Sequence, residues 1–136
     1  MKLLSTTVTD EPQIQEWIDA DPDHRGKSTA DWWLTGKSML SFCLQDSKGP
    51  LCYVRLDAGE RTVLHTQFAP REQVSLVRLV KGMLWCVPIV VAYADSQRAK
   101  GVVYKSTNQT LIDFMQKKFA FISVGGDDYA FDFEVE

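Results

Sequence analysis

The stretch that decides the fold is residues 102–133, which read VVYKSTNQTLIDFMQKKFAFISVGGDDYAFDF. A β-rich run over residues 101–106 comes first, and Thr107 or Asn108 then caps an amphipathic helix that ends in two lysines. The turn at residues 125–128 contains two glycines and joins two short β-like runs into a closing hairpin. A strand, a capped helix and a hairpin in this order predict the last part of a mixed α+β domain.

Working back from this stretch, residues 71–97 predict a long helix. Its apolar residues spread over more than half of the helical circumference, which favours a helix buried on more than one side. Pro88 must kink or break this helix, and we expect a kinked continuation to residue 97.

The preceding residues predict an antiparallel meander. Three β-rich runs, over residues 38–45, 51–56 and 61–68, are separated by short turns. Residues 2–8 predict a further strand, followed by two short helices, and the second helix carries Trp32 and Trp33. Two interpretations of this pair stay open: a lid packed on the sheet, or a side chain that lines a substrate cleft.

Composition sets broad limits. The length of 136 residues fits one domain, residues 1–136, and the share of hydrophobic residues, 45%, is typical of a folded protein. The net charge of −3 gives no reason to expect nucleic-acid binding. The two histidines lack ligand spacing to any cysteine, so we expect no metal site, and the three cysteines fit reduced thiols of a cytoplasmic protein. The longest apolar run, residues 83–94, is too short to cross a bilayer, so we expect no membrane segment.

The order of the expected elements resembles the GNAT superfamily of acyl-coenzyme A dependent N-acetyltransferases. Asn108 stands at the family's asparagine, and residues 119–121 lie near its Gly-Phe pair, with Ala120 in place of the glycine. The resemblance implies a GNAT-like α+β fold, with a mostly antiparallel sheet of about six to seven strands, a central helix and flanking helices. It also implies acetyl-coenzyme A as cofactor and a small-molecule or protein amine as acceptor.

The same resemblance places the cofactor where strand 61–68 ends and the central helix begins. The residues that it marks as cofactor-binding are Phe68, Arg71, Gln73, Val74, Ser75 and Asn108. In the family a loop of the form Gln/Arg-x-x-Gly-x-Gly/Ala exposes backbone N–H groups that hold the pyrophosphate at the helix N-terminus. Here Arg71 fits the first position, whereas Val74 and Leu76 replace the glycines, and we expect their side chains to crowd the backbone.

The expected catalytic residues are His65 and Tyr104. The family often uses a tyrosine on the last helix as general acid, but Met115 stands at that position, seven after Asn108. Tyr104, on the preceding strand, is the nearest substitute. His65, which shares one face of its strand with Gln67, could act as general base near neutral pH, and the competing interpretation is that it only fills the sheet face.

Three hypotheses for the function follow. The first is an acyltransferase. The second is a non-catalytic interaction module with a protein partner, because short divergent GNAT-like proteins of tailed bacteriophages, some of them carried in the virion, are similar in size. The third is self-association through strand 129–135, although the acidic residues on this strand protect its edge.

Overall fold

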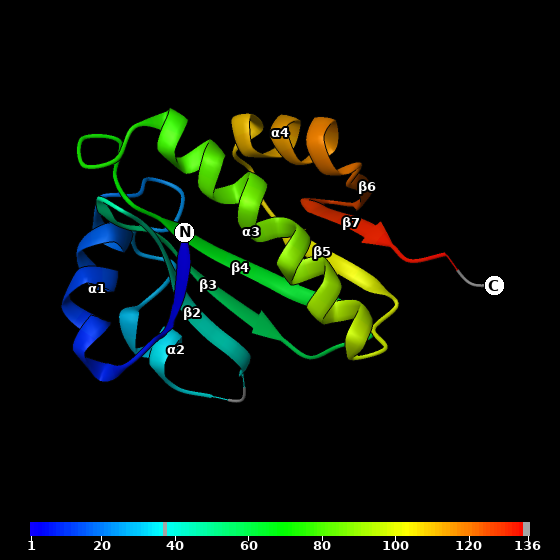
Figure 1. Ribbon diagram of the computed structural model, residues 1–136, viewed down its shortest axis with the longest axis horizontal. Helices are drawn as coiled ribbons and strands as arrows, with labels where there is room; N and C mark the ends of the chain where they lie inside the picture. Colours follow the sequence, from blue (N-terminus) through cyan, green and yellow to red (C-terminus); the bar gives the residue numbers. More distant parts are fainter. Residues whose placement is uncertain (37, 135–136) are drawn as a thin grey trace.

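The computed structural model describes residues 1–36 and 38–134, which form one seven-stranded sheet covered by helices (Figure 1). In chain order the elements are β1 (Lys2–Ser5), the 3₁₀ helix η1 (Val8–Asp10), α1 (Glu11–Asp19), α2 (Ala30–Leu34), β2 (Ser38–Asp46), β3 (Gly49–Asp57), β4 (Thr62–Phe68), α3 (Leu76–Ser96), β5 (Gly101–Lys105), α4 (Gln109–Phe119), β6 (Ile122–Gly125) and β7 (Asp128–Asp132). The strands are arranged in the order β1-β2-β3-β4-β5-β7-β6. This architecture confirms the predicted α+β class and the strand–helix–hairpin order at the C-terminal end.

Neighbouring strands are antiparallel everywhere except between β4 and β5. The parallel pairing joins Thr62 to Val102 and Val63 to Val103. Beyond these pairs β4 runs on to Phe68 and β5 to Lys105, and no further pairing joins them in the described part of the chain. The two strands therefore separate towards their C-terminal ends, and the sheet opens there (Figure 1).

The helices form two layers. The connections from β4 through α3 to β5, and from β5 through α4 to β6, both cross in the same direction along the sheet. Because such crossovers are right-handed, α3 and α4 lie on the same face of the sheet, and α1 and α2 cover the other face (Figure 1). The side chains of a strand alternate between these two environments.

Helix α3 continues through Pro88 as one helix, and its first residue is Leu76 where the sequence predicted a start near Arg71. The expectation that it is buried on more than one side is wrong. Val77 is 62% exposed and Leu84 is 42% exposed, because the sheet covers only the inner side of the helix. Gly82 lies on that inner side, where an added Cβ would stand 2.9 Å from a methyl carbon of Leu51, so this glycine permits close packing of helix and sheet.

Two local predictions can be compared with the structure directly. The three cysteines are free and buried, as predicted. Ala120, which replaces the glycine of the Gly-Phe pair, ends α4 with φ 59° and ψ 28°. This left-handed conformation normally favours glycine at a helix end. The backbone conformation therefore explains the family's glycine, and in this chain an alanine adopts the same conformation.

Candidate functional site

The loop between α1 and α2 is tied to the end of β4 at the point where the sheet opens. Gln67 is fully buried, and its Oε1 lies 2.6 Å from Nδ1 of His24. Its Nε2 donates to Oδ2 of Asp21 at 3.1 Å, and that carboxylate also lies 3.2 Å from Nδ1 of His24. A buried amide needs partners for both ends, so Gln67 fixes the loop on the α1/α2 face of β4.

The same loop reaches the other side of the opening. Oδ2 of Asp23 accepts a hydrogen bond of 3.4 Å from Nδ2 of Asn108, which stands between β5 and α4. Asn108 also caps α4, because its Oδ1 accepts from the backbone N–H of Leu111 at 3.1 Å. The loop thus spans from β4 to the start of α4, and the predicted cofactor residue Asn108 uses both ends of its amide within the protein.

His65 belongs to a second polar group on the same face. Its Nε2 lies 3.0 Å from Oδ2 of Asp57, and its ring packs edge-on against Trp32 with 4.8 Å between centroids. The side chain is 34% exposed, and partial burial lowers the pKa of His65 from its ordinary 6.5, while Asp57 acts in the opposite direction. A neutral His65 that donates through Nε2 to the carboxylate keeps Nδ1 as a proton acceptor at neutral pH.

Arg55 fixes the position of α2 above this histidine. It is 5% exposed, it donates to the carbonyl oxygens of Trp32 and Thr35, the latter at 2.9 Å, and it contacts Oδ1 of Asp57 at 3.0 Å. Its guanidinium carbon stands 4.1 Å from the centroid of the Trp32 ring, a cation–π contact. Trp32 therefore contacts both Arg55 and His65, so one tryptophan of the predicted pair borders the candidate site and the other, Trp33, is buried in the core.

The cofactor loop has a different geometry from that expected. The carbonyl oxygen of Pro70 accepts the N–H groups of Gln73 at 2.9 Å and of Val74 at 3.0 Å, so these two donors are occupied. The crowding expected from Val74 is absent, because its side chain is buried in the hydrophobic core. Ser75 caps α3 by accepting from the backbone N–H of Arg78.

Two donors remain at the start of α3. The N–H groups of Leu76 and Val77 occupy the first turn, where no intrahelical acceptor exists, and no other partner is found in the described residues. Arg71 is exposed nearby in sequence, whereas the side chain of Gln73 donates to Oε1 of Glu16 at 3.1 Å. The helix start can therefore offer two N–H groups and the helix dipole to an anion.

The structure does not bring His65 and Tyr104 together. Val63 pairs with Val103 and Thr62 with Val102, so Tyr104 projects from the face opposite His65. The hydroxyl of Tyr104 is buried without a hydrogen-bond partner among the described residues, and burial raises the pKa of Tyr104 well above 10. Met115 is likewise buried in the core. The described chain thus offers His65 as a candidate base, whereas the predicted proton donor, Tyr104, is buried on the opposite face.

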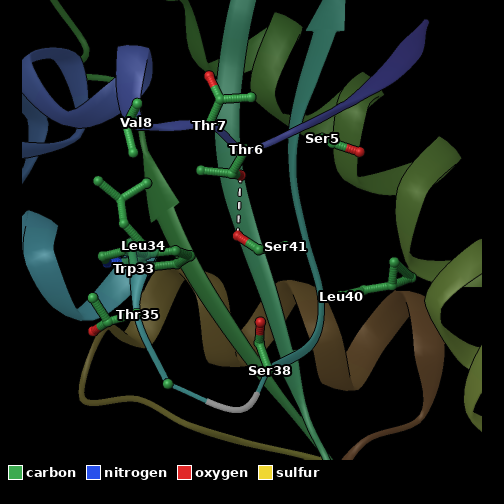
Figure 2. A pocket seen from close by; sticks show the side chains of 11 residues that line it. Ser5, Thr6, Thr7, Val8, Trp33, Leu34, Thr35, Ser38, Leu40 and Ser41 are labelled. Carbon is green, nitrogen blue, oxygen red and sulfur yellow. Dashed lines mark hydrogen bonds between the residues drawn. The ribbon is translucent and has the colours of Figure 1, made fainter.

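A hollow in the surface lies elsewhere (Figure 2). It measures about 400 Å³ and sits between β1, α2 and β2, at the edge of the sheet away from β5. Hydroxyl groups line much of it, and Oγ of Ser41 donates to Oγ1 of Thr6 at 3.0 Å across its wall (Figure 2). None of the predicted site residues lines this hollow. In residues 1–36 and 38–134 no group of three acidic, histidine or cysteine side chains is arranged to hold a metal ion.

Sequence reasoning missed His24, Asp21 and Asp57 as members of the candidate site. His24 and Asp21 meet Gln67 across 43 and 46 positions, whereas Asp57 lies only eight residues before His65. The sequence did place His65 and Gln67 on one face of β4, which was the only local signal for the group. The sequence of the loop between α1 and α2 is that of an ordinary charged connection.

Comparison with known proteins defines the fold. No family model and no curated protein sequence matches the chain. A domain from Methanocaldococcus jannaschii superposes with a TM-score of 0.70 at 10% identity, covering 95% of this chain and 94% of that one. The ribosomal-protein-S18-alanine N-acetyltransferase of Escherichia coli superposes with a TM-score of 0.64 at 12% identity, covering 95% of this chain and 88% of the other. Neither structure is described as a phage protein. With the strand order and the opening between β4 and β5, these likenesses show that the chain has a divergent GNAT-like fold.

Proposed function

We propose that the protein is an acyl-coenzyme A dependent N-acyltransferase that transfers the acyl group directly to an amine. The observation that carries the proposal is the separation of β4 from β5 beside the start of α3. In support, the E. coli neighbour with this fold is named as an N-acetyltransferase. Fold likeness at this low identity is analogy, so the chemistry has to be argued from the residues.

The opening between the strands fits an extended acyl chain. Beyond Val63 the edge of β4 that faces β5 has no strand partner among residues 1–36 and 38–134, so its backbone groups can bond to a ligand. The pyrophosphate of the cofactor would lie at the N–H groups of Leu76 and Val77, with Arg71 as the nearby cation and Phe68 and Ser75 at the ends of the loop. When bound, acyl-coenzyme A supplies an activated thioester.

His65 is the proposed base. The amine forms a bond to the thioester carbon and the carbon–sulfur bond breaks, while the proton of the amine passes to Nδ1 of His65. Asp57 then stabilises the imidazolium through Nε2. Because Met115 carries no acidic proton, the leaving thiolate takes its proton from water. Trp32 borders the acceptor side, and the acceptor is a small-molecule or protein amine.

Isothermal titration with acetyl-coenzyme A tests the first step. We expect binding that is weakened when Leu76 is replaced by proline, which removes one of the two free N–H groups at a position that tolerates proline. The matched control is Leu84→Ala on the exposed side of the same helix, with binding unchanged. Absence of binding at millimolar cofactor would reject the proposal.

Transfer to an amine tests the second step. Replacing His65 with glutamine should lower the rate by roughly 10²–10⁴-fold, the usual contribution of a general base, and leave cofactor affinity intact. The control is His24→Gln, which alters the neighbouring histidine. Equal loss in both variants would assign the effect to the fold of the loop and not to a base.

A second candidate is a non-catalytic interaction module. It is favoured by the occupied N–H groups of Gln73 and Val74 and by the bridge from Asp23 to Asn108, which holds a loop across the opening. The same titration separates the two candidates: no cofactor binding, with co-purification of a protein partner or a virus particle, would support the module. Cytoplasmic or virion location stays a prediction in either case.

A further inference from the structure

The outer side of α3 carries an apolar stripe that no segment of the described residues covers. Three large residues of this helix beyond its first turn are 39–42% exposed: Leu84, Trp85 and Ile89. Pro88 and Ala92 are exposed between and after them, so from Leu84 to Ala92 the outward side has no charge. Figure 1 shows α3 lying along the outside of its layer, free along this side. A contiguous apolar patch of this kind marks an interaction surface more often than plain solvent-exposed surface.

One charge of each sign lies at either end of the stripe. Lys81 lies seven residues before Pro88 and Asp95 seven residues after it, and both are exposed. Seven residues are about two turns of helix, so both charges lie on the side of Pro88, roughly 10 Å from it in either direction. Neither has a salt-bridge partner within the described residues.

We propose that two copies of this chain associate through α3, with the helices antiparallel and the twofold axis at Pro88. In this arrangement Lys81 of each copy faces Asp95 of the other, because both positions are equally distant from the axis. Leu84 faces Ala92 of the second copy, so a large side chain meets a small one and the helices can approach closely. An isologous contact of this kind needs a surface that is complementary to itself, and this stripe satisfies the condition in both charge and size.

Trp85 is the expected centre of the contact energy. Tryptophan is enriched among the residues that dominate interfaces, and buried apolar surface supplies most of their stability. A membrane surface is the rival occupant, since α3 is long and apolar enough to be a membrane helix by length and composition alone. Helices that lie on membranes carry lysine and arginine along the polar side, whereas this stripe is bounded by one charge of each sign.

The stripe is separate from the candidate cofactor site. That site uses the first turn of α3 at Leu76 and Val77, and the twofold axis passes the middle of the helix. Dimer formation can therefore be tested independently of acyltransferase activity. Variants at Lys81, Trp85 and Asp95 should leave cofactor binding unchanged.

Sedimentation velocity of the full chain over a range of concentrations is the first test. We expect a dimer, and Trp85→Lys should give a monomer with an unchanged circular dichroism spectrum. The control is Val8→Lys, which changes a more exposed apolar residue outside the stripe and should remain a dimer. A wild-type chain that stays monomeric at the highest concentration overturns the proposal.

Charge exchange gives a second, sharper test. Lys81→Glu and Asp95→Lys should each raise the dissociation constant about tenfold or more, because each places like charges opposite one another twice. The double variant Lys81→Glu/Asp95→Lys should restore the wild-type value, since the pairs form again with reversed sign. Failure of the double variant to recover the wild-type dissociation constant overturns the antiparallel arrangement. If the chain forms no dimer in solution and its monomers bind vesicles of phosphatidylcholine and phosphatidylglycerol, the stripe is a lipid-binding surface instead.

Discussion

The two faces of the sheet formed by β2, β3 and β4 differ in the kinds of contact that their side chains make. On the face under α1 and α2, polar side chains reach specific partners: Tyr53 lies 2.7 Å from Oε1 of Gln13, Arg55 bonds carbonyl oxygens around α2, and Gln67 holds the loop after α1. On the face under α3, the strands carry mostly apolar side chains, which belong to the hydrophobic core. Apolar packing predominates at α3, with one added ion pair between Arg78 and Asp46, whereas many directional bonds add to the apolar packing of α1, α2 and their loop.

This difference explains where chemistry can occur. Apolar packing gives stability but no proton acceptor, and the Tyr104 hydroxyl of that face is buried without a hydrogen-bond partner in the described residues. The α1/α2 face combines positioned titratable groups with partial exposure, as at His65. Groups of this kind are the usual components of active sites.

The largest expected effect is the loss of Arg55. Replacing it with methionine keeps the apolar stem but leaves the carbonyl oxygens of Trp32 and Thr35 without their donor and Asp57 without its cation. Removing one partner of a buried charge pair usually costs about 3–5 kcal/mol of unfolding free energy. Chemical denaturation measures it. The control is Arg61→Met, which breaks an ion pair with Asp132 near the surface and should shift the midpoint far less; equal shifts would contradict the role of the polar face.

The opposite face should respond through packing alone. Leu56 is buried beneath α3, and Leu56→Ala should lower the unfolding free energy by about 2–5 kcal/mol through lost transfer energy and the remaining cavity. Acyl-coenzyme A affinity, corrected for the folded fraction, should not change. A selective loss of affinity in this variant would show that the two faces are coupled.

The same division decides what could be predicted from the sequence. Periodic patterns identified the elements of the apolar face, such as β4 and the helix after Asn108, because hydrophobic spacing is a local signal. The polar face depends on pairs distant in the chain, such as His24 with Gln67 and Asn108 with Asp23, which no local pattern contains. The prediction that α3 is buried on more than one side was wrong for a related reason. Apolar residues lie on several sides of this helix, and their pattern does not indicate which side packs against the rest of the same chain.

Acid conditions test the lowered pKa of His65. Its folded pKa is lower than the ordinary value of 6.5 that it regains on unfolding, so below pH 6.5 the unfolded state binds more protons. The stabilising contribution of neutral His65 is therefore complete above pH 6.5 and is lost as the pH falls towards the folded pKa. We expect the difference in unfolding free energy between wild type and His65→Gln to shrink on acidification through this window. A constant difference would contradict the lowered pKa.

The pH dependence of the transfer rate should follow the pKa of His65. If His65 accepts the proton of the amine, the acid limb of the transfer rate must lie below pH 6.5, because the neutral form is already complete at neutral pH. Replacing Arg55, whose charge lowers the pKa of His65, should move that limb to higher pH. A limb above pH 7 in the wild type would point to another base.

The smallest effect is expected at Tyr104. Its hydroxyl is buried beside the rings of Phe121 and Tyr129 and has no partner in the described residues, so Tyr104→Phe removes an unsatisfied polar group and keeps the ring packing. Removal of a buried group without a partner is close to neutral or stabilising, within about 1 kcal/mol. Thermal denaturation and the transfer rate should both stay near the wild-type values. Because Tyr104 projects from the face opposite His65, a large loss of rate with unchanged stability would mean that the acceptor approaches through the α3/α4 side, and the division between the two faces would have to be abandoned.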